Sequence, residues 1–297
     1  MNEPRLAIAD FTTFIALEPT NPCGFYLRGR LREELSEHDR ALADFARALR
    51  IDPRFVPAHC ARGEIYRERG ELDLAIREYD EAIAIDPQVP GVYDNRGIVH
   101  DLNGDYARAR ADYDKSLALN PNSSNTHNNR GYSHRLAGDL DLAIADYDRS
   151  IALDDRNAIA YVNRGAAWYA KADYDRALAD YTRAIDATSA AHKLAGVYAN
   201  RASVWEMKDA PERAIADLDK AIELDPRNVK LYVCRGDILC QVKCDFRRGI
   251  ADYGRAIALT PDDCDLYISR CAARVLSWRL FGAVADFCRI VKLCFSS

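Results

Sequence analysis

The sequence has little of what marks a membrane-bound, secreted or nucleic-acid-binding protein. No apolar run approaches the roughly 18 residues of a transmembrane helix. The start, MNEPRLAIAD, contains two acidic residues and no long apolar stretch, so it does not resemble a secretory signal. The 41 Lys and Arg are outnumbered by 46 Asp and Glu, which gives a net charge of −5 and argues against the basic surface of a dedicated nucleic-acid binder. We therefore expect a cytoplasmic protein with no membrane insertion and no nucleic-acid partner.

Motifs of catalysis are missing as well. The chain has no phosphate-binding glycine loop, no nucleophile elbow and no HExxH sequence. Seven of the nine cysteines follow residue 233, but Cys240-x3-Cys244 and Cys264-x6-Cys271 do not match the spacing of common zinc modules, and no histidine lies in that region. We predict structural thiols in a reducing compartment, with no metal, no cofactor and no enzymatic activity.

What the sequence does have is enough apolar residues for a core, 48%, and an internal repeat. Pro19, Pro53, Pro87 and Pro121 are each 34 residues apart. Ten residues after each such position comes a glycine column: Gly29, Gly63, Gly97, Gly131, Gly165 and Gly236. A small residue and then a large apolar residue follow, as in Ala41 and Phe45. In a helix–turn–helix unit we expect the small residues of the two helices to face each other and the aromatic residue to fill the gap between units.

The repeat strongly resembles the tetratricopeptide repeat, as in YVNRGAAWYAKADYDRALADYTRAI from Tyr161 and YDNRGIVHDLNGDYARARADYDKSL from Tyr93. The resemblance covers essentially the whole chain and implies an all-α, right-handed superhelical solenoid of antiparallel helix pairs. We expect one solenoid domain, 1–297, made of a half-repeat and eight repeats: 1–19, then 20–53, 54–87, 88–121, 122–155, 156–192, 193–226, 227–261 and 262–297.

Two charged columns depart from the family pattern. An arginine precedes the small residue of the first helix in all eight repeats: Arg28, Arg62, Arg96, Arg130, Arg164, Arg201, Arg235 and Arg270. A carboxylate precedes the large apolar residue of the second helix: Asp44, Glu78, Asp112, Asp146, Asp180, Asp217, Asp252 and Asp286. We expect a structural ion-pair ladder between the helices. The alternative is a row of arginines that binds anionic ligands.

The sequence also predicts how single members of the ladder contribute to stability. Loss of Arg130 is expected to be tolerated or mildly destabilising, whereas loss of Asp146 should cost more by leaving a charge unpaired.

A partner-binding groove is implied by the resemblance, because first helices line the concave face in this family. Four consecutive repeats carry an asparagine there, Asn95, Asn129, Asn163 and Asn200. Stacked carboxamides can hold an extended peptide backbone, and the row is similar to the asparagines of the repeat domain of O-linked N-acetylglucosamine transferase, which hold substrate peptide. The alternative is that each asparagine only caps or solvates its helix. The other predicted groove residues are Arg67, Asp94, Asn128, Tyr132, Arg135 and Tyr169.

These features predict a protein–protein interaction adaptor that holds a peptide or helical segment of a protein partner. Two alternatives remain open at this stage. The chain could be the repeat portion of a larger enzyme or signalling protein that presents substrate to a catalytic domain elsewhere. It could also be a self-assembling structural protein, with a homodimer formed through the apolar C-terminal helix of Phe281–Phe295.

Overall fold

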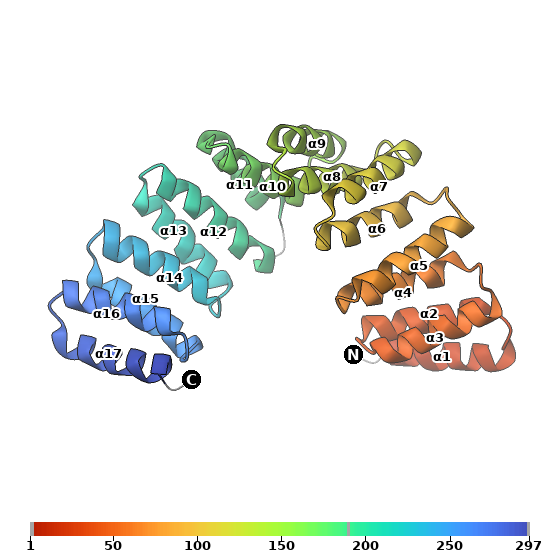
Figure 1. Cartoon of the computed structure of the whole chain (residues 1–297), viewed down its shortest axis with the longest axis horizontal. Helices are drawn as coiled ribbons and strands as arrows, with labels where there is room; N and C mark the ends of the chain where they lie inside the picture. Colours follow the sequence, from red (N-terminus) through yellow and green to blue (C-terminus); the bar gives the residue numbers. More distant parts are fainter. Residues whose placement is uncertain (1–2, 189–190, 296–297) are drawn as a thin grey trace. The chain divides into compact units, whose positions relative to one another are not determined.

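The computed structural model describes residues 3–188 and 191–295, and their side chains except those of 191–193 and 294–295. Every element within these ranges is a helix, and consecutive helices pack as antiparallel pairs (Figure 1). The prediction of an all-α helical repeat fold is confirmed. The chain forms two compact units, Met1–Asp155 and Arg156–Ser297, and the division falls between two of the predicted repeats.

The first unit contains one helix followed by four pairs. The single helix α1, Glu3–Leu17, packs against the first helix of the first pair. The pairs are α2–α3 (Pro22–Glu34, His38–Ile51), α4–α5 (Val56–Glu68, Leu72–Ile85), α6–α7 (Pro90–Leu102, Tyr106–Leu119) and α8–α9 (Ser124–Leu136, Leu140–Leu153).

The second unit also contains four pairs, and a π-helical segment, Ile238–Val242, continues the first helix of the third. The pairs are α10–α11 (Ala158–Ala170, Tyr174–Ala187), α12–α13 (Ala191–Met207, Pro211–Leu224), α14–α15 (Val229–Asp237, Phe246–Leu259) and α16–α17 (Cys264–Leu276, Leu280–Phe295).

Local sequence explains where the helices end. Asp52 and Asp86 follow second helices in an extended conformation, with φ of −130° and −139°, and the proline after each disfavours a helical conformation in the preceding residue. The turn inside a pair requires a left-handed residue, as at Gly104 with φ of 77°. Asp105 then caps the next helix, because its side chain accepts a hydrogen bond from the Arg108 amide at 3.1 Å. Such local signals therefore mark helix ends at recurring positions of the repeat.

The glycine column allows the two helices of a pair to approach closely. A Cβ atom on Gly131 would lie 2.8 Å from Cε1 of Tyr147, and one on Gly29 would lie 2.5 Å from Cε1 of Phe45. The ring of the second helix thus lies directly over the glycine of the first helix, whereas we expected it to fill the gap between units. These rings are fully buried, with 0% of Phe45 and Tyr147 exposed.

One repeat accommodates an extra residue without losing the pattern. Arg235 and its partner Asp252 are 17 positions apart, whereas Arg130 and Asp146 are 16 apart. The π-helical segment absorbs the additional residue, since each of its turns contains one residue more than an α-turn. Cys240 of this segment lies where a side chain at position 249 would be, which explains the glycine there.

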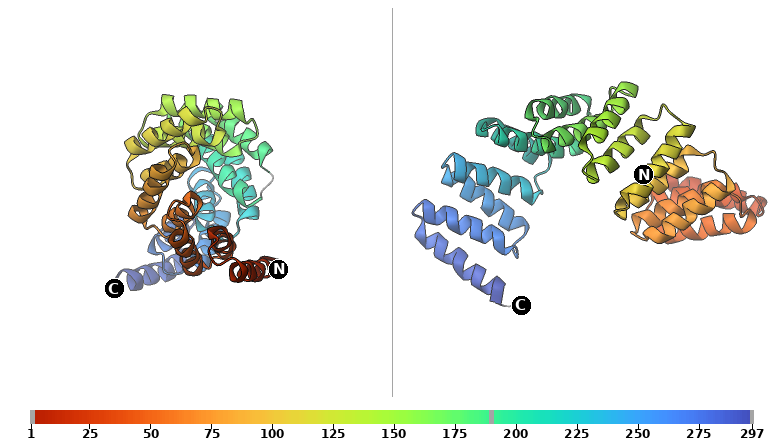
Figure 2. Two further views of the ribbon diagram at one scale, coloured as in Figure 1. Left: turned by 90° about the vertical axis from the view of Figure 1, so that its right-hand side faces the viewer. Right: turned by 45° about the horizontal axis from the view of Figure 1, so that its top comes forward.

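First helices of neighbouring pairs contact each other in both units. In the first unit α2 contacts α4, α4 contacts α6 and α6 contacts α8, and in the second unit α10 contacts α12 (Figures 1 and 2). We call the surface that the first helices form together the inner face of the unit. All of the predicted groove residues belong to these helices.

Candidate functional site

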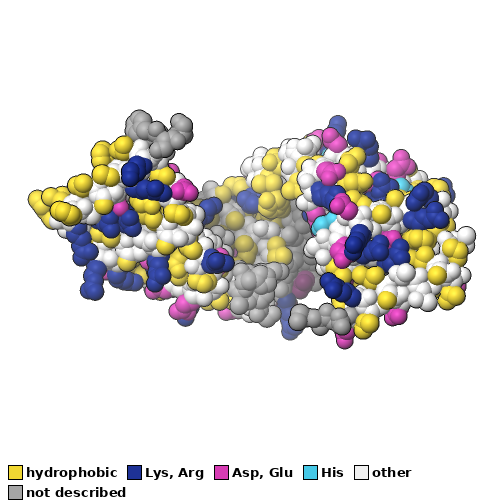
Figure 3. All heavy atoms as spheres, turned by 90° about the horizontal axis from the view of Figure 1, so that it is seen from below, with side chains coloured by type: hydrophobic (Ala, Val, Ile, Leu, Met, Phe, Trp, Pro, Cys, Tyr) yellow, Lys and Arg dark blue, Asp and Glu magenta, His cyan; other side chains and the backbone are white. Residues whose placement is uncertain are grey.

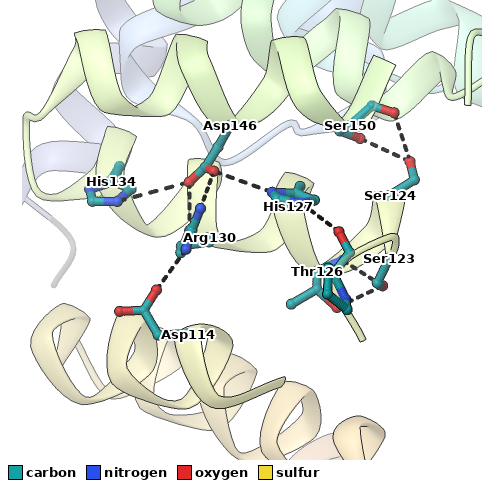
Figure 4. A network of polar contacts seen from close by, with 10 residues as sticks. Asp114, Ser123, Ser124, Thr126, His127, Arg130, His134, Asp146 and Ser150 are labelled. Carbon is teal, nitrogen blue, oxygen red and sulfur yellow. Dashed lines mark hydrogen bonds and ion pairs between the residues drawn. The ribbon is translucent and has the colours of Figure 1, made fainter. Parts of the chain in front are cut away.

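Each ladder arginine joins the two helices of its own pair. Nε and Nη2 of Arg130 on α8 donate to the two carboxylate oxygens of Asp146 on α9, at 2.9 and 2.6 Å (Figure 4). This fork-to-fork geometry is the strongest arrangement available to a guanidinium and a carboxylate. His127 and His134 contact the same carboxylate at 3.4 and 3.9 Å.

The structure brings together all eight predicted pairs of arginine and carboxylate. Seven are bidentate, and in the other Nη2 of Arg62 contacts only Oε1 of Glu78, at 2.9 Å. Six of the guanidinium groups also lie over the aromatic ring one turn earlier in the same helix, as Arg96 does over Tyr93 at 5.9 Å. The ladder is therefore part of the packing between helices.

A second carboxylate column extends the ladder from one pair to the next, and the sequence analysis missed it. Nη1 of Arg130 donates to Asp114 on the preceding second helix at 2.7 Å (Figure 4). Asp80 and Asp219 accept from the next pair's arginine in the same way. The signal was visible in the sequence Asp-Tyr-Asp at 112–114, in which the first carboxylate serves its own pair and the second serves the next pair.

The carboxylates of the ladder are more deeply buried than the arginines. The side chain of Asp146 is 9% exposed and that of Arg130 is 25% exposed. The hydrogen bonds to Asp146 raise the pKa of Arg130 above its usual value, so this arginine stays charged. Three of its N–H groups point to carboxylate oxygens, which supports a structural role over the binding of an anionic ligand.

Because Asp146 is more buried than Arg130, the structure leads us to expect that losing Arg130 destabilises the protein more than losing Asp146. This is the opposite of the order expected from the sequence. We expect Arg130→Leu to destabilise the protein by about 3 kcal/mol, because it leaves a buried carboxylate without its cation. Asp146→Ala should cost less, since the exposed part of Arg130 can still pair with Asp114. The shift of the urea-unfolding midpoint, followed by circular dichroism, measures both effects.

The matched control for this pair is the double variant Arg130→Leu with Asp146→Leu. Replacing both partners with apolar residues removes the unpaired charge, so most of the lost stability should return. A double variant that is as unstable as Arg130→Leu would contradict the buried-carboxylate explanation.

His59 is a second basic side chain at one carboxylate of the ladder, Glu78. Its Nδ1 lies 2.8 Å from Oε2 of Glu78, and its Nε2 lies 3.2 Å from the carbonyl oxygen of Pro53. Both neighbours are acceptors, so both ring nitrogens carry a proton when the two hydrogen bonds form together. The hydrogen bond to Glu78 raises the pKa of His59 above its usual value of 6.5, against the opposing effect of burial. Tyrosines occupy this column in other repeats, and Tyr232 donates its hydroxyl to the carbonyl of Pro226 at 3.1 Å.

The raised pKa of His59 predicts a pH dependence of stability. The stabilisation is fully present below the unfolded-state pKa, and it is lost as the pH rises through the higher pKa of the folded state. His59→Tyr keeps a donor to Pro53 and removes this titration. We expect the wild type to exceed His59→Tyr in Tm by a few degrees more at about pH 5.5 than at about pH 8.5. A Tm difference that does not change with pH would contradict the assignment.

On the inner face of the first unit, two predicted groove residues line a pocket between α6 and α8. The pocket has a volume of about 270 Å³, with Asn129 and Tyr132 on α8 among its walls. Its remaining lining residues are Ile98, Asp101, Leu102, Tyr113 and Leu136. The structure thus places a carboxamide, a phenol and a carboxylate around a largely apolar space.

The other predicted groove residues of the first unit are placed less uniformly. Asn128 is buried, with 8% of it exposed, which leaves little surface for a partner. Asp94 accepts a hydrogen bond from Thr126 at 2.8 Å, and burial raises the pKa of its carboxyl. Arg135 lies over the ring of Tyr132, with its guanidinium carbon 5.0 Å from the ring centroid.

Arg67 and Asn95 complete the predicted set in this unit. Arg67 lies near the C-terminal end of α4 and Asn95 lies in the middle of α6, and both are partly exposed.

The second unit contains a comparable pocket of about 240 Å³ between α10 and α12. Asn200 and Val162 line it together with Ile159 and Val197. Asn163 lies on α10 and is partly exposed, and the ring of Tyr169 lies 5.8 Å from that of Tyr174. In each unit, one asparagine of the predicted row therefore borders an apolar pocket.

Hydroxyl groups of the second helices also reach the inner face, which the sequence analysis did not anticipate. The buried ring of Tyr113 extends from α7 past the glycine column, and its hydroxyl donates to Oδ2 of Asp101 on α6 at 2.8 Å. Tyr253 donates to Asp237 at 2.7 Å in the same manner in the second unit. These two tyrosines therefore place hydroxyl groups at the inner face.

Part of the inner face is already neutralised by contacts within the protein. Arg30 on α2 bridges Glu33, at 3.1 Å, and Glu64 on α4, at 2.5 Å. Burial is the largest cause that raises the pKa of Glu33 to about 7, and Glu64 adds to the effect.

The cysteines and histidines form no metal-binding cluster in the described residues. Eight cysteines are described, and all are free thiols. Burial raises the pKa of Cys60 to about 11, which keeps that thiol protonated and unreactive. No helix in the described ranges has the length and apolar character needed to cross a membrane.

The fold and the inner face together define an α-helical repeat scaffold. The family model described as tetratricopeptide repeat matches residues 1–54, 95–158 and 137–192, which is about half of the chain, and a second model, described as TPR repeat, matches residues 63–104. The chain belongs to the tetratricopeptide repeat family. It is therefore a repeat scaffold of the kind that supports protein–protein interaction. No curated protein matches this sequence.

Solved structures share the fold at low sequence identity. The Cut9 and Hcn1 hetero-tetramer of the APC/C contains a chain with a TM-score of 0.67 and 17% identity, over 90% of this chain and 52% of that one. This chain therefore spans about half of its length. A tetratricopeptide repeat protein from Parabacteroides merdae gives a TM-score of 0.64 and 19% identity, over 85% and 98% of the two chains. PilF of Pseudomonas aeruginosa gives 0.60 and 17%, over 71% and 94%.

Proposed function

We propose that this protein is a non-catalytic adaptor that holds an extended peptide segment of a protein partner on the inner face. The observation that carries the proposal is the meeting of carboxamides and apolar pockets there. Asn129 borders the pocket of the first unit and Asn200 that of the second. A carboxamide offers both a donor and an acceptor to a peptide backbone, and a neighbouring apolar pocket can take a side chain of the same peptide.

The framework behind this face supports the proposal. The ladder contacts join consecutive pairs, as Arg130 does between α7 and α9, so the first helices present their side chains from fixed positions. A surface that is preformed loses little conformational entropy when it binds. The arginines of the ladder are occupied by carboxylates, which leaves the variable residues of the inner face to select the partner.

Substitution of the inner-face asparagines tests the proposal. Twelve-residue peptides selected by the wild type from a random displayed library are the probe, and their Kd is measured by fluorescence anisotropy. We expect Asn95→Ala with Asn129→Ala to weaken binding about tenfold, which corresponds to about 1.4 kcal/mol, through the loss of hydrogen bonds to the peptide.

The matched control is Asn103→Ala, which removes an exposed carboxamide from the turn between α6 and α7. It should leave the Kd unchanged. If the library yields no binding peptide, or if both variants bind as the wild type does, the adaptor proposal fails.

A second candidate function, self-association, is favoured by the apolar surface at α16 and α17. The exposed fractions are 98% for Phe281, 86% for Trp278, 62% for Val284 and 59% for Phe287. Figure 3 shows hydrophobic side chains gathered over this end of the second unit, at its left. Exposed apolar surface of this kind favours association with another protein surface, and a two-fold contact between copies of α17 would cover it.

Sedimentation equilibrium over a range of concentrations tests self-association. We expect the apparent mass of the wild type to rise toward that of a dimer, and Phe281→Glu with Val284→Glu to remain monomeric, because a charge would have to be buried in the contact. Leu6→Glu, at an exposed apolar position on α1, is the control that should not change the mass. A wild type that is monomeric throughout would contradict self-association.

A further inference from the structure

The pocket between α6 and α8 combines apolar walls with a carboxylate. Its sides are the aliphatic side chains of Ile98, Leu102 and Leu136, and a carboxylate, Asp101, also lines it. Oδ2 of Asp101 accepts the hydroxyl hydrogen of the buried Tyr113 at 2.8 Å. Oδ1 is buried and has no donor in good hydrogen-bond geometry, although the side chain of Ser133 on α8 interacts with this carboxylate and lowers its pKa. A buried acceptor that lacks a partner is costly to leave in that state.

No cation of the protein neutralises this carboxylate by direct contact. Among the described side chains, none forms an ion pair with Asp101 within 4.0 Å, although the hydrogen bonds of Ser133 and Tyr113 and the field of Arg110 on α7 lower its pKa. Burial is the larger effect and raises that pKa. Glu33, at the same register on α2, does have an arginine beside it, Arg30 at 3.1 Å. At this register, Glu33 is therefore paired with a cation within the first unit and Asp101 is not.

We propose that this pocket binds the side chain of a lysine or arginine in the partner peptide. The aliphatic walls would cover the methylene groups of that side chain, and its charged end would reach the carboxylate. Tyr132 also lines the pocket, but the guanidinium of Arg135 already lies over its ring at 5.0 Å, so the carboxylate of Asp101 is the group that the peptide's charged end would contact. The inference rests on the proposed adaptor function and specifies which peptides the adaptor selects.

The neighbouring charges further restrict which peptide sequences can bind. Arg67 on α4 and Arg135 on α8 lie at the register position of Asp101 in the flanking first helices. A second or third basic residue in the peptide would meet these arginines and be repelled. An extended chain advances about 3.3 Å per residue, and packed helices are about 10 Å apart, so roughly three residues separate neighbouring positions. We therefore expect one basic residue in a neutral or acidic context.

A double-mutant cycle between protein and peptide tests the pocket. The probe is a peptide selected by the wild type from the random library, compared with the same peptide carrying norleucine or citrulline in place of its lysine or arginine. We expect the neutral peptide to bind the wild type about tenfold more weakly. With Asp101→Asn, which keeps an acceptor for Tyr113, both peptides should bind with Kd values within about twofold of each other. Asp73→Asn, on the exposed side of α5, is the control that should preserve the wild-type difference.

The outcomes separate this inference from the adaptor proposal. Selected peptides that carry one basic residue, with a preference lost in Asp101→Asn and kept in Asp73→Asn, support the pocket. Peptides without a basic preference, or an equal loss on neutralisation in the wild type and in Asp101→Asn, overturn it. If such peptides still weaken with Asn95→Ala and Asn129→Ala, only the inference about the pocket fails. A library that yields no peptide at all overturns both proposals.

Discussion

The contact on which the structure depends is a single arginine shared by three helices. Arg130 holds the carboxylate of Asp146 with two N–H groups and that of Asp114 with a third. A lysine has one nitrogen and could not hold two carboxylates in this planar arrangement. Because Asp146 is buried, its carboxylate must be hydrogen-bonded. Its contact with Arg130 therefore fixes the rotation of α9 about the helix axis.

That rotation determines the packing of the neighbouring residue. Tyr147 follows Asp146 directly, so the carboxylate contact places the aromatic ring over Gly131, where a Cβ atom would lie 2.8 Å from the ring. The ring then points toward the inner face, as it does in Tyr113, whose hydroxyl reaches Asp101. The tripeptide Asp-Tyr-Asp thus provides the contact within a pair, the close packing of its helices and the contact to the next pair. The tyrosine hydroxyl groups at the inner face are a consequence of the same geometry.

Repetition made much of this predictable from the sequence. An arginine and a carboxylate in every repeat indicated a paired contact, and all eight pairs meet in the structure. Features that occur in a single repeat left no repeated pattern in the sequence. The carboxylate of Asp101 and the burial of Asn128 depend on which side chains stand beside them in three dimensions, and no periodicity records that. The relative burial of Arg130 and Asp146 was also hidden, because sequence columns give residue types and not depth.

The same distinction indicates where partner selection can reside. Residues that occur in every repeat are occupied by packing, since their hydrogen bonds and apolar surfaces face neighbouring helices. Residues that differ between repeats, such as Arg67, Asp101 and Arg135 at one register of α4, α6 and α8, are not required by the framework. Their charges alternate in sign along the inner face. A framework that neutralises its own ladder leaves these side chains to set the local electrostatic potential, so the choice of partner depends on the positions at which the repeats differ.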